Sequence, residues 1–310
     1  MKLSVIIATY ARPDDLRGAV QSLDRQTRLP DEIIVVAWKG DTPTLTALAD
    51  LARREPAGPV LPELRVVLTE KRGVTAEENA GMREARGDVL CFMDDDARAR
   101  PDWLLRLEAH YRDPGVGAAG GRDVIWLQGR VLEREARTVG RVHFLGRLSA
   151  NHHERVRSLQ EVDFLKGCNM SFRREALAPI DERLVGVIPY GFEIDLGLCA
   201  RRKGWRILYD PDIQVDHYPT TNYSADSQEM AFTVNHNQTY VLLKHLAWPR
   251  KLAFLAYTFG VGDKNTIGLA RVPNLVLRRH WPAAVLKAQF AGKLAGIRTY
   301  LRGAGRREEA

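Results

Sequence analysis

An apolar run that ends in three consecutive acidic residues constrains the fold of this chain more than any other feature. Val89–Met93 is apolar throughout, and Asp94, Asp95 and Asp96 follow it directly. Such a run is typical of a central strand in a parallel sheet, whose C-terminal end reaches the edge where open α/β sheets bind ligands. Adjacent carboxylates repel one another, so we expect a cation to neutralise them, and oxygen ligands suit Mg²⁺ or Mn²⁺. The alternative is a solvated turn.

The first 120 residues alternate between strand-like runs and segments of helical periodicity. We expect strands at 3–8, 33–36, 65–68 and 88–93, and helices at 13–26, 45–53 and 75–85. This βαβ order predicts a parallel sheet with a nucleotide-sized crevice. Residues 120–165 follow no period and are expected to be irregular, with His152 and His153 in a solvated loop rather than in a metal site.

Periodicity returns after Asp163. The expected elements are an ordered segment at 164–174, a helix at 191–203, a strand at 205–209 and helices at 230–245 and 283–302. The last helix is amphipathic and cationic, and it can either pack on the protein or lie on a membrane surface. We therefore predict an α/β catalytic domain over 1–225 and a basic amphipathic helical extension, able to associate with a membrane, over 226–310.

Charge is distributed unevenly along the 310 residues. The net charge is +7, yet residues 244–310 alone hold thirteen Lys and Arg against three acidic residues. No stretch reaches the roughly 18 uncharged apolar residues that a spanning helix needs, so any membrane contact would be peripheral, with an anionic surface. The basic region has few interleaved aromatic residues and no nucleic-acid-reading motif, which argues against nucleic acid as a partner.

Cysteine use and the N-terminus predict the compartment. The three cysteines, Cys91, Cys168 and Cys199, show no metal-ligand spacing and are expected to be reduced thiols. The run Leu3–Ala8 is preceded only by Lys2 and one Met and is interpreted as a core strand rather than a signal peptide. A cytoplasmic location is expected, extending to the inner face of the cell membrane.

Several segments resemble, in chain order, the family 2 glycosyltransferases with the GT-A nucleotide-sugar-binding fold. The similar segments are Ser4–Arg12, Gln26–Thr27, Asp31–Val36, Asn79–Asp88, Asp94–Asp96, Gly167–Arg173, Glu193–Leu196, Gly204–Trp205 and His217. Their order is more specific than any one of them. The resemblance implies a Rossmann-like GT-A domain with a mostly parallel central sheet plus the C-terminal helices. It also implies an inverting, metal-dependent enzyme of the bacterial envelope or exopolysaccharide type.

The resemblance further implies roles for the matched positions. Asp94, Asp96 and His217 would hold Mn²⁺ or Mg²⁺, although His217 can also be a satisfied histidine at a strand end. The nucleotide-sugar contacts would come from Thr9, Tyr10, Arg12, Trp38, Asp41, Arg72, Asn79, Asp95, Gly167 and Asn169. Where the family often has an acid after the second strand, this chain has Ala37–Asp41. Three interpretations stay open: Trp38 stacks on the base, Asp41 replaces the acid, or Trp38 is a packing residue.

Inversion at the anomeric carbon requires a base that takes the proton from the acceptor hydroxyl. Glu193, near the start of a helix, is the first candidate, although the family usually has Asp at this position. Asp195 is the rival candidate. A spacing of two residues places the two carboxylates on different faces of the helix, so only one can readily reach the acceptor.

The predicted reaction moves a sugar from a UDP-, dTDP- or GDP-linked donor to a hydroxyl of a surface glycan or a lipid-linked acceptor. The lipid part depends on the basic helices and on a loose resemblance of Asn235–Tyr240 to envelope-glycan members of the family. One alternative is a sugar nucleotidyltransferase, but Ala8–Arg12 lacks the glycines of its phosphate loop. The other is a non-catalytic basic module that binds a membrane or a polyanion. The sugar, the acceptor, the linkage and the oligomeric state stay open.

Overall fold

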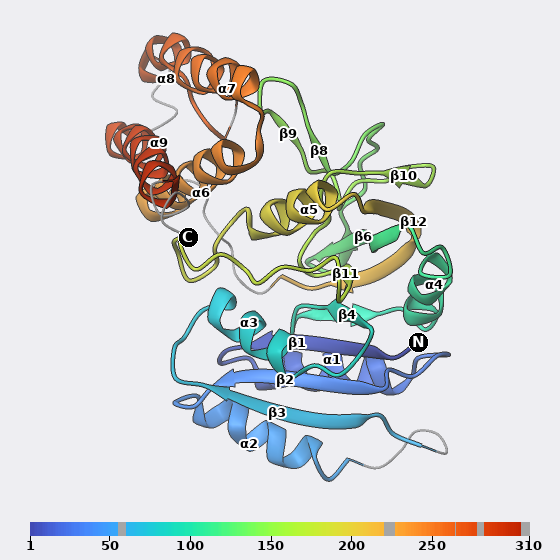
Figure 1. Ribbon diagram of the computed structural model, residues 1–310. Coiled ribbons are helices and arrows are strands. Elements are labelled where there is room, and N and C mark those ends of the chain that lie inside the picture. Colours follow the sequence, from blue (N-terminus) through green and yellow to red (C-terminus); the bar gives the residue numbers. More distant parts are fainter. Residues whose placement is uncertain (55–59, 220–226, 264, 278–281, 305–310) are drawn as a thin grey trace. The chain divides into compact units, whose positions relative to one another are not determined.

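The computed structural model describes residues 1–54, 60–219, 227–263, 265–277 and 282–304 (Figure 1). The chain divides into two compact units, each assembled from separate stretches of sequence. The first contains residues 1–141, 150–180 and 196–221, and the second contains 142–149, 181–195 and 222–310. The predicted boundary between 225 and 226 lies outside the described residues.

A mixed β-sheet forms the centre of the first unit. Its strand order within the described residues is β10-β12-β6-β11-β4-β1-β2-β3, with β5 beside β12 and β7 beside β6. β4, β1, β2 and β3 are parallel neighbours, and β6 is parallel to β12, while β11 runs antiparallel between β4 and β6. The prediction of a mostly parallel sheet is confirmed. The strands are β1 (Leu3–Thr9), β2 (Glu32–Trp38), β3 (Glu63–Thr69), β4 (Val89–Phe92), β5 (Ala97–Ala99), β6 (Val116–Leu127), β7 (Arg130–Val131), β10 (Gln160–Glu161), β11 (Met170–Arg173) and β12 (Arg206–His217).

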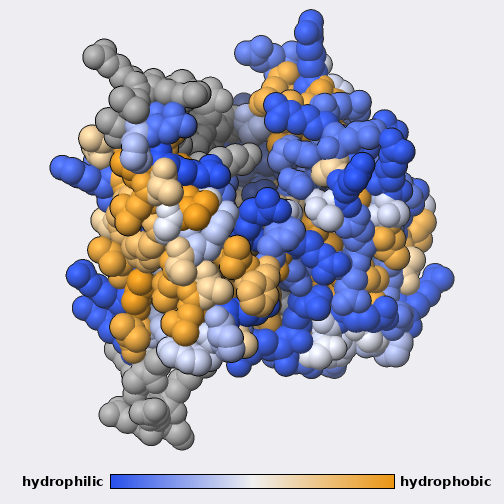
Figure 2. All heavy atoms as spheres, turned by 90° about the horizontal axis from the view of Figure 1, so that it is seen from above, coloured by the Kyte–Doolittle hydropathy of each residue, from blue (hydrophilic) through white to orange (hydrophobic). Residues whose placement is uncertain are grey.

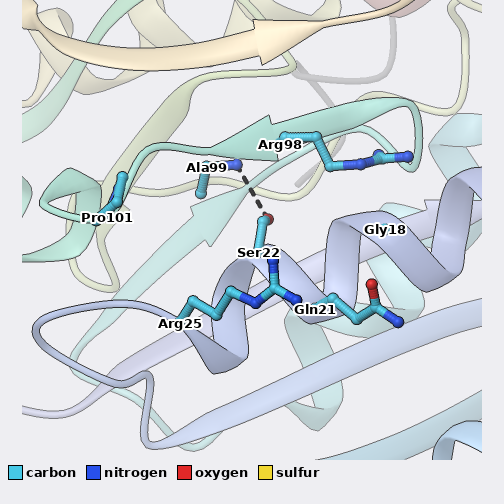
Figure 3. A pocket seen from close by; sticks show the side chains of 7 residues that line it. All are labelled: Gly18, Gln21, Ser22, Arg25, Arg98, Ala99 and Pro101. Atoms are coloured by element: carbon cyan, nitrogen blue, oxygen red, sulfur yellow. Dashed lines mark hydrogen bonds between the residues drawn. The ribbon is translucent and has the colours of Figure 1, made fainter. Parts of the chain in front are cut away.

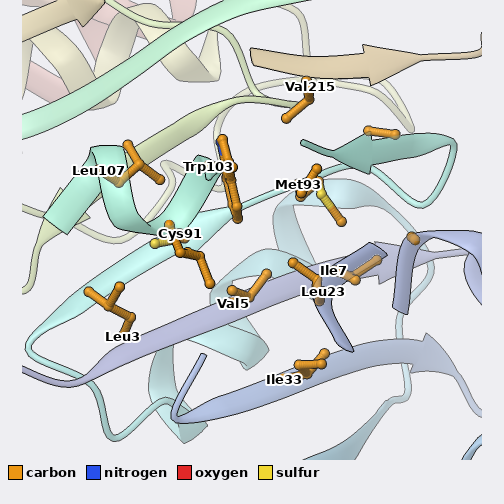
Figure 4. Packing of buried hydrophobic residues seen from close by; sticks show 14 of the residues in the cluster. Leu3, Val5, Ile7, Leu23, Ile33, Cys91, Met93, Trp103, Leu107 and Val215 are labelled. Carbon is orange, nitrogen blue, oxygen red and sulfur yellow. The ribbon is translucent and has the colours of Figure 1, made fainter. Parts of the chain in front are cut away.

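Helices connect the parallel strands and cover the sheet. They are α1 (Pro13–Asp24), α2 (Thr42–Leu51), α3 (Val74–Glu84) and α4 (Trp103–His110). A further helix, α5 (Phe192–Arg202), is divided between the units, since its residues up to Asp195 belong to the second. Pro13 suits the first turn of α1, where its missing N–H has no intrahelical acceptor to lose. Figure 4 shows Val5 and Ile7 of β1, Cys91 and Met93 of the β4 region, and Trp103 of α4 gathered in one apolar cluster. Packing against this core fixes the ends of β1 and β4.

The expectation that residues 120–165 are irregular is wrong in part. β6 occupies Val116–Leu127 and is a strand inside the sheet. Its small residues, including Gly120 and Gly121, gave no β signal because they carry little or no apolar side chain. The structure needs them small, since a Cβ at Gly121 would overlap the carbonyl oxygens of Ile213 and Asp210.

Two other expectations are corrected. His152 does not lie in a solvated loop: its ring is buried, and its Nε2 lies 3.2 Å from the carbonyl oxygen of Phe164. β12 extends to His217, well beyond the predicted 205–209, because the strand continues past an irregularity between Asp210 and Gln214. Pro211 lies within that irregularity, where its missing N–H costs the sheet little.

The second unit is mainly helical. Its elements are α6 (Gln228–His245), α7 (Trp248–Gly260), η1 (Leu269–Arg271), α8 (Val272–Leu277) and α9 (Ala283–Ala304), and β8 (Arg141–Val142) pairs with β9 (Leu148–Ser149) at its edge. A Cβ at Gly292 would overlap the carbonyl oxygen of Phe232, and one at Gly296 would lie 2.5 Å from that of His236. The two glycines therefore let α9 pack closely on α6. The predicted helices at 230–245 and 283–302 are confirmed, whereas α7 was not predicted.

Candidate active site

Three acidic side chains lie at the carboxyl end of β4, beside the end of β1. The Thr9 hydroxyl donates to Asp95 Oδ2 at 2.8 Å, and Arg12 Nη1 donates to Asp95 Oδ1 at 3.0 Å and to Asp96 Oδ2 at 2.8 Å. Because β1 and β4 are parallel neighbours, their last residues meet at one edge of the sheet. The structure thus brings together Thr9, Arg12 and Asp94–Asp96, as the sequence predicted.

His217 reaches the same edge from the end of β12. Its Nε2 lies 3.2 Å from Asp96 Oδ1, and its Nδ1 lies 2.9 Å from Asp123 Oδ1. Burial alone would lower the pKa of His217, but its contacts with Asp123 and Asp96 outweigh burial and raise it. Burial would raise the pKa of Asp123, but His217 holds it below its usual range. The His217 ring is therefore held between two carboxylates.

Asp94, Asp96 and His217 can meet a single cation. Their ligand atoms all lie within 4.8 Å of one another. Asp96 Oδ1 is buried and has no hydrogen-bond partner among the described residues, although His217 faces it as an ion pair. A buried carboxylate oxygen without a hydrogen bond is costly unless a ligand completes its surroundings. Two carboxylates and one imidazole are a donor set that suits a divalent ion such as Mn²⁺.

Burial and neighbouring charges raise the pKa values of two acids in this cluster. Burial, with the neighbouring charge of Asp96, raises the pKa of Asp94 to about 6. Burial also raises the pKa of Asp95 to about 7, in spite of the Arg12 guanidinium beside it. Carboxylates held this far from their ordinary pKa are frequent at functional sites, because function requires charges to be gathered there.

Tyr10, Trp38 and Arg72 form an aromatic and cationic group at the ends of β1, β2 and β3. The Arg72 guanidinium carbon lies 3.7 Å from the centroid of the Tyr10 ring, and the Tyr10 and Trp38 rings are 6.3 Å apart. Asp41 is buried beside the same loops, where it accepts from the Ala11 backbone N–H and from Thr44 at the start of α2. Both Asp41 oxygens are thus occupied within the protein, whereas the Tyr10, Trp38 and Arg72 side chains are partly exposed.

Three predicted donor contacts lie apart from this group. Asn79 of α3 is buried and bonds both backbone groups of Ile180. Asn169 is fully buried, accepting from the Trp103 indole and donating to two backbone carbonyls. Gly167 lies in the buried turn just before β11. The described contacts of these two asparagine side chains are with other parts of the protein and stabilise the fold.

Glu193 and Asp195, both in the first turn of α5, belong to the second unit. Asp195 is 1% exposed and accepts from Lys244 Nζ at 2.8 Å and from His245 Nε2 at 2.6 Å. Glu193 is half-buried on the other side of the helix turn. Asp195 is therefore held between two basic side chains.

Two acidic residues near the site escaped the sequence analysis. Asp123, the partner of His217, follows the Gly-rich part of β6 and is 94 residues away in sequence. Glu77 lies at the start of α3, where burial raises its pKa to about 7. An acidic residue after an apolar run was an available signal for Asp123, but the glycines concealed the strand. Nothing in the sequence distinguishes Glu77 from a surface glutamate of a helix.

An open pocket elsewhere in the first unit contains none of the predicted site residues. Figure 3 shows Ser22 of α1 accepting from the backbone N–H of Ala99, with Arg25 and Arg98 at the rim. Arg98 also donates to the carbonyl oxygens of Asp95 and Ala97. The pocket thus lies behind the acidic turn and is separate from the carboxylate oxygens. Among the helices of the described residues, none combines the length and the apolar character needed to cross a bilayer.

Comparison with known families finds one match. The model described as "Glycosyl transferase family 2" matches residues 4–180, which is more than half of the chain. This region contains the acidic turn, the loop after β1 and Asp123, but not His217 or the base candidates.

Related proteins are similar over most of the chain. The O-antigen biosynthesis protein RfbC of Myxococcus xanthus is 27% identical over 241 residues, covering 73% of this chain, although the chain spans only 18% of RfbC. The glucosyl-dolichyl phosphate glucuronosyltransferase of Haloferax volcanii is 25% identical, with 70% of this chain and 69% of that protein covered.

A solved structure supports the fold. The mannosyltransferase PcManGT from Pyrobaculum calidifontis, in complex with GDP-Man and Mn²⁺, superposes with a TM-score of 0.56. It is 18% identical and covers 97% of this chain and 87% of that one. At this identity the likeness concerns architecture: a central sheet with a helical C-terminal part.

Proposed function

Because the chain belongs to glycosyl transferase family 2, we propose that it transfers a sugar, with inversion, from a nucleoside-diphosphate donor to a hydroxyl group. The observation that carries this proposal is the meeting of Asp94, Asp96 and His217 at one sheet edge, with a buried Asp96 oxygen that has no described hydrogen-bond partner. This oxygen faces the His217 ring at 3.2 Å, and a cation held by the three side chains would complete its surroundings.

Mn²⁺ or Mg²⁺ is the proposed cofactor, and Asp94, Asp96 and His217 are its proposed ligands. When bound, such an ion neutralises the charge that grows on a departing diphosphate. The fit is supported by the donor set and by the mutual reach of the three ligand atoms. Asp123 would then orient the His217 ring through its 2.9 Å contact with Nδ1, as carboxylates commonly do for ligating histidines.

The donor is proposed to bind along the ends of β1, β2 and β3. Tyr10, Trp38 and Arg72 offer two rings and an exposed guanidinium, which suit a nucleobase and a phosphate. Thr9 and Arg12 hold Asp95 in place and keep the neighbouring loop close to the acids. A UDP-, dTDP- or GDP-linked sugar would satisfy these groups.

Glu193 is proposed as the base that takes the acceptor proton. Asp195 already accepts from Lys244 and His245, so its protonation would weaken both contacts, although Lys244 also faces Asp181. Asp195 would serve instead to fix the first turn of α5 from which Glu193 projects. Replacement of each carboxylate by its amide separates the roles: Glu193→Gln should remove turnover without loss of stability.

The acceptor is proposed to be a surface glycan or a lipid-linked precursor. RfbC is named for O-antigen biosynthesis, and the Haloferax protein for acting on a glucosyl-dolichyl phosphate. These names support an acceptor of the envelope type. A cytoplasmic location with peripheral contact to the inner face of the membrane belongs to the same proposal.

Calorimetric titration tests the donor and the metal together. Wild type and Asp96→Asn are titrated with nucleotide sugars and nucleoside diphosphates, first with Mn²⁺ and then with EDTA. Asp102→Asn, the same change at an exposed residue next to α4, is the matched control. Metal-dependent binding that survives in the control and is lost in Asp96→Asn is expected. Binding of no sugar nucleotide, or release of pyrophosphate from a nucleoside triphosphate, would contradict the proposal.

A further inference from the structure

Helix α7 exposes an apolar stripe. Trp248 is 68% exposed and Leu252 is 54% exposed, and Ala256 continues the same line one turn later. Residues four apart lie on one face of a helix, so the three form a continuous strip. The opposite face is apolar at its centre too, since Phe254 is buried. A helix that is apolar on both faces requires a second environment besides its own core.

Helix α9 lies beside α7 and extends this surface. Lys251 Nζ donates to the Tyr300 hydroxyl at 2.6 Å, and the Phe259 and Phe290 rings are 6.3 Å apart. Leu294 of α9 is exposed, as is Leu301. The exposed basic residues of α9 alternate with them, at Lys287, Arg298 and Arg302. Figure 2, seen from above, shows apolar side chains gathered on one face with hydrophilic ones around them.

The hairpin between β8 and β9 packs on another side of α7 than the stripe, since its contacts are with Arg250 and Phe254. Arg250 of α7 donates to the carbonyl oxygen of His143 at 3.0 Å, and Phe144 beside it is 64% exposed. Gly146 approaches Phe254 so closely that a Cβ there would overlap the ring. These contacts hold the hairpin tip against the N-terminal half of α7.

The charge of this surface has a single sign. α7 and α9 together contain six Lys and Arg residues and no acidic residue. One of the six, Lys293, is fully buried and donates to the carbonyl oxygens of Thr258 and Ile267. The others lie at or near the surface, around exposed Trp and Leu side chains. An anionic partner with an apolar interior is complementary to such a pattern.

We propose that the α7–α9 face, formed by Trp248, Leu252, Ala256, Leu294, Arg298 and Leu301, docks on an anionic lipid bilayer. This deepens the proposed function by naming the surface at which a lipid-linked acceptor is met. Trp248 and Leu252 insert at the level of the headgroups, while Arg298 and Arg302 meet the lipid phosphates. The apolar face predicted for 283–302 is only partly available, because Leu286 is buried and Gly292 and Gly296 face α6.

Vesicle flotation of the full chain tests the apolar part. Wild type is mixed at low salt with phosphatidylcholine vesicles, with and without phosphatidylserine. Binding only to the anionic vesicles is expected, weakened about tenfold or more in Trp248→Ser/Leu252→Ser because two large apolar side chains no longer leave water. Leu68→Ser is the control, since Leu68 of β3 is also 54% exposed. Equal binding of the double variant and the control would overturn the proposal.

The charged part is tested by Arg298→Gln/Arg302→Gln against Arg112→Gln/Arg130→Gln, which has the same net charge and alters exposed residues of the first unit. Each α9 arginine should contribute about fivefold to binding, and the effect should fade with added salt. If both double variants lost vesicle binding equally, net charge alone would explain the attraction, and the assignment of the α7–α9 face would be wrong. Donor binding is measured by calorimetry in parallel. If the protein binds the donor but not the vesicles, only the membrane proposal is refuted. If it binds the vesicles but not the donor, only the proposed function is refuted.

Discussion

Two buried carboxylate clusters in this chain have opposite electrostatic character. At the end of β4, the pKa values of Asp94 and Asp95 are raised, and one Asp96 oxygen has no described hydrogen-bond partner. In the second unit, burial alone would raise the pKa of Asp181, but its hydrogen bonds from Arg183, from Tyr240 at 2.6 Å and from Lys244 at 2.9 Å outweigh burial and lower it. The first cluster gathers more negative charge than its neighbours neutralise, whereas the second is balanced. Burial of acidic residues alone therefore does not indicate a functional site, whereas a buried cluster with uncompensated negative charge does.

The largest expected effect comes from removing an acid of the unbalanced cluster. Asp96→Asn should lower glycosyl transfer about a thousandfold, equivalent to about 4 kcal/mol of transition-state stabilisation. The melting temperature without metal should stay the same or rise, because repulsion among the acids is relieved. Turnover and calorimetric unfolding on one preparation check both halves. A stability loss equal to that of an ordinary core mutation would indicate that the cluster is balanced after all.

An Asp-to-Asn change in the balanced cluster of the second unit should lower the stability of the protein rather than act on turnover directly. Asp195→Asn leaves Lys244 and His245 buried beside a neutral amide, and breaking a buried pair in this way costs about 3 kcal/mol. Denaturant unfolding measures the loss. A double variant, Asp195→Asn with Lys244→Met, should recover part of it; failure to recover any would argue against charge imbalance as the cause.

A pH-dependent test sharpens the comparison within the first unit. Burial raises the pKa of Glu77 to about 7, so the folded state binds its proton more tightly than the unfolded state does. Stability from this residue is therefore present below pH 4.5 and is lost as the pH rises to about 7. Glu77→Gln should stabilise the protein by about 2 kcal/mol at pH 8 and change little at pH 4.5. Urea unfolding at both pH values measures the free energy of unfolding. An equal change at pH 4.5 and pH 8 would contradict the raised pKa of Glu77.

The smallest expected effect has the opposite sign. Asp181 has a lowered pKa, so its contribution is present above its ordinary pKa and is lost as the pH falls below about 4. Asp181→Asn should cost about 1–2 kcal/mol at pH 7, and the difference from wild type should shrink in acid. Acid-induced unfolding followed by circular dichroism measures this. The control is Asp50→Asn on α2, which removes the exposed ion pair of Asp50 with Arg17. It should change the stability neither at pH 7 nor in acid.

The sequence predicted the elements whose signals are local. The alternation over 3–93 predicted β1 to β4, and the acids after Met93 marked the end of β4, because the burial and the ends of these strands follow from neighbouring residues. β6 was missed because its glycines and alanines are selected by close backbone approach, as at Gly121. The Asp123–His217 pair and the capture of Asp195 by Lys244 depend on residues that only folding brings together. The exposure of individual side chains could not be inferred from the sequence either, so the exposed apolar residues of α7 were not predicted.

The assembly of the second unit from three stretches of sequence has a consequence for how the chain is made. Asp195 leaves the ribosome 49 residues before Lys244 and 50 before His245, and the close contacts of Gly292 and Gly296 come later still. Asp195 therefore waits for its basic partners until α6 has been synthesised, and α6 itself receives its close packing only with α9. The first unit has by then been complete in sequence, and it can fold ahead of the second. The synthesis of α9 thus marks the moment at which this part of the protein can become native.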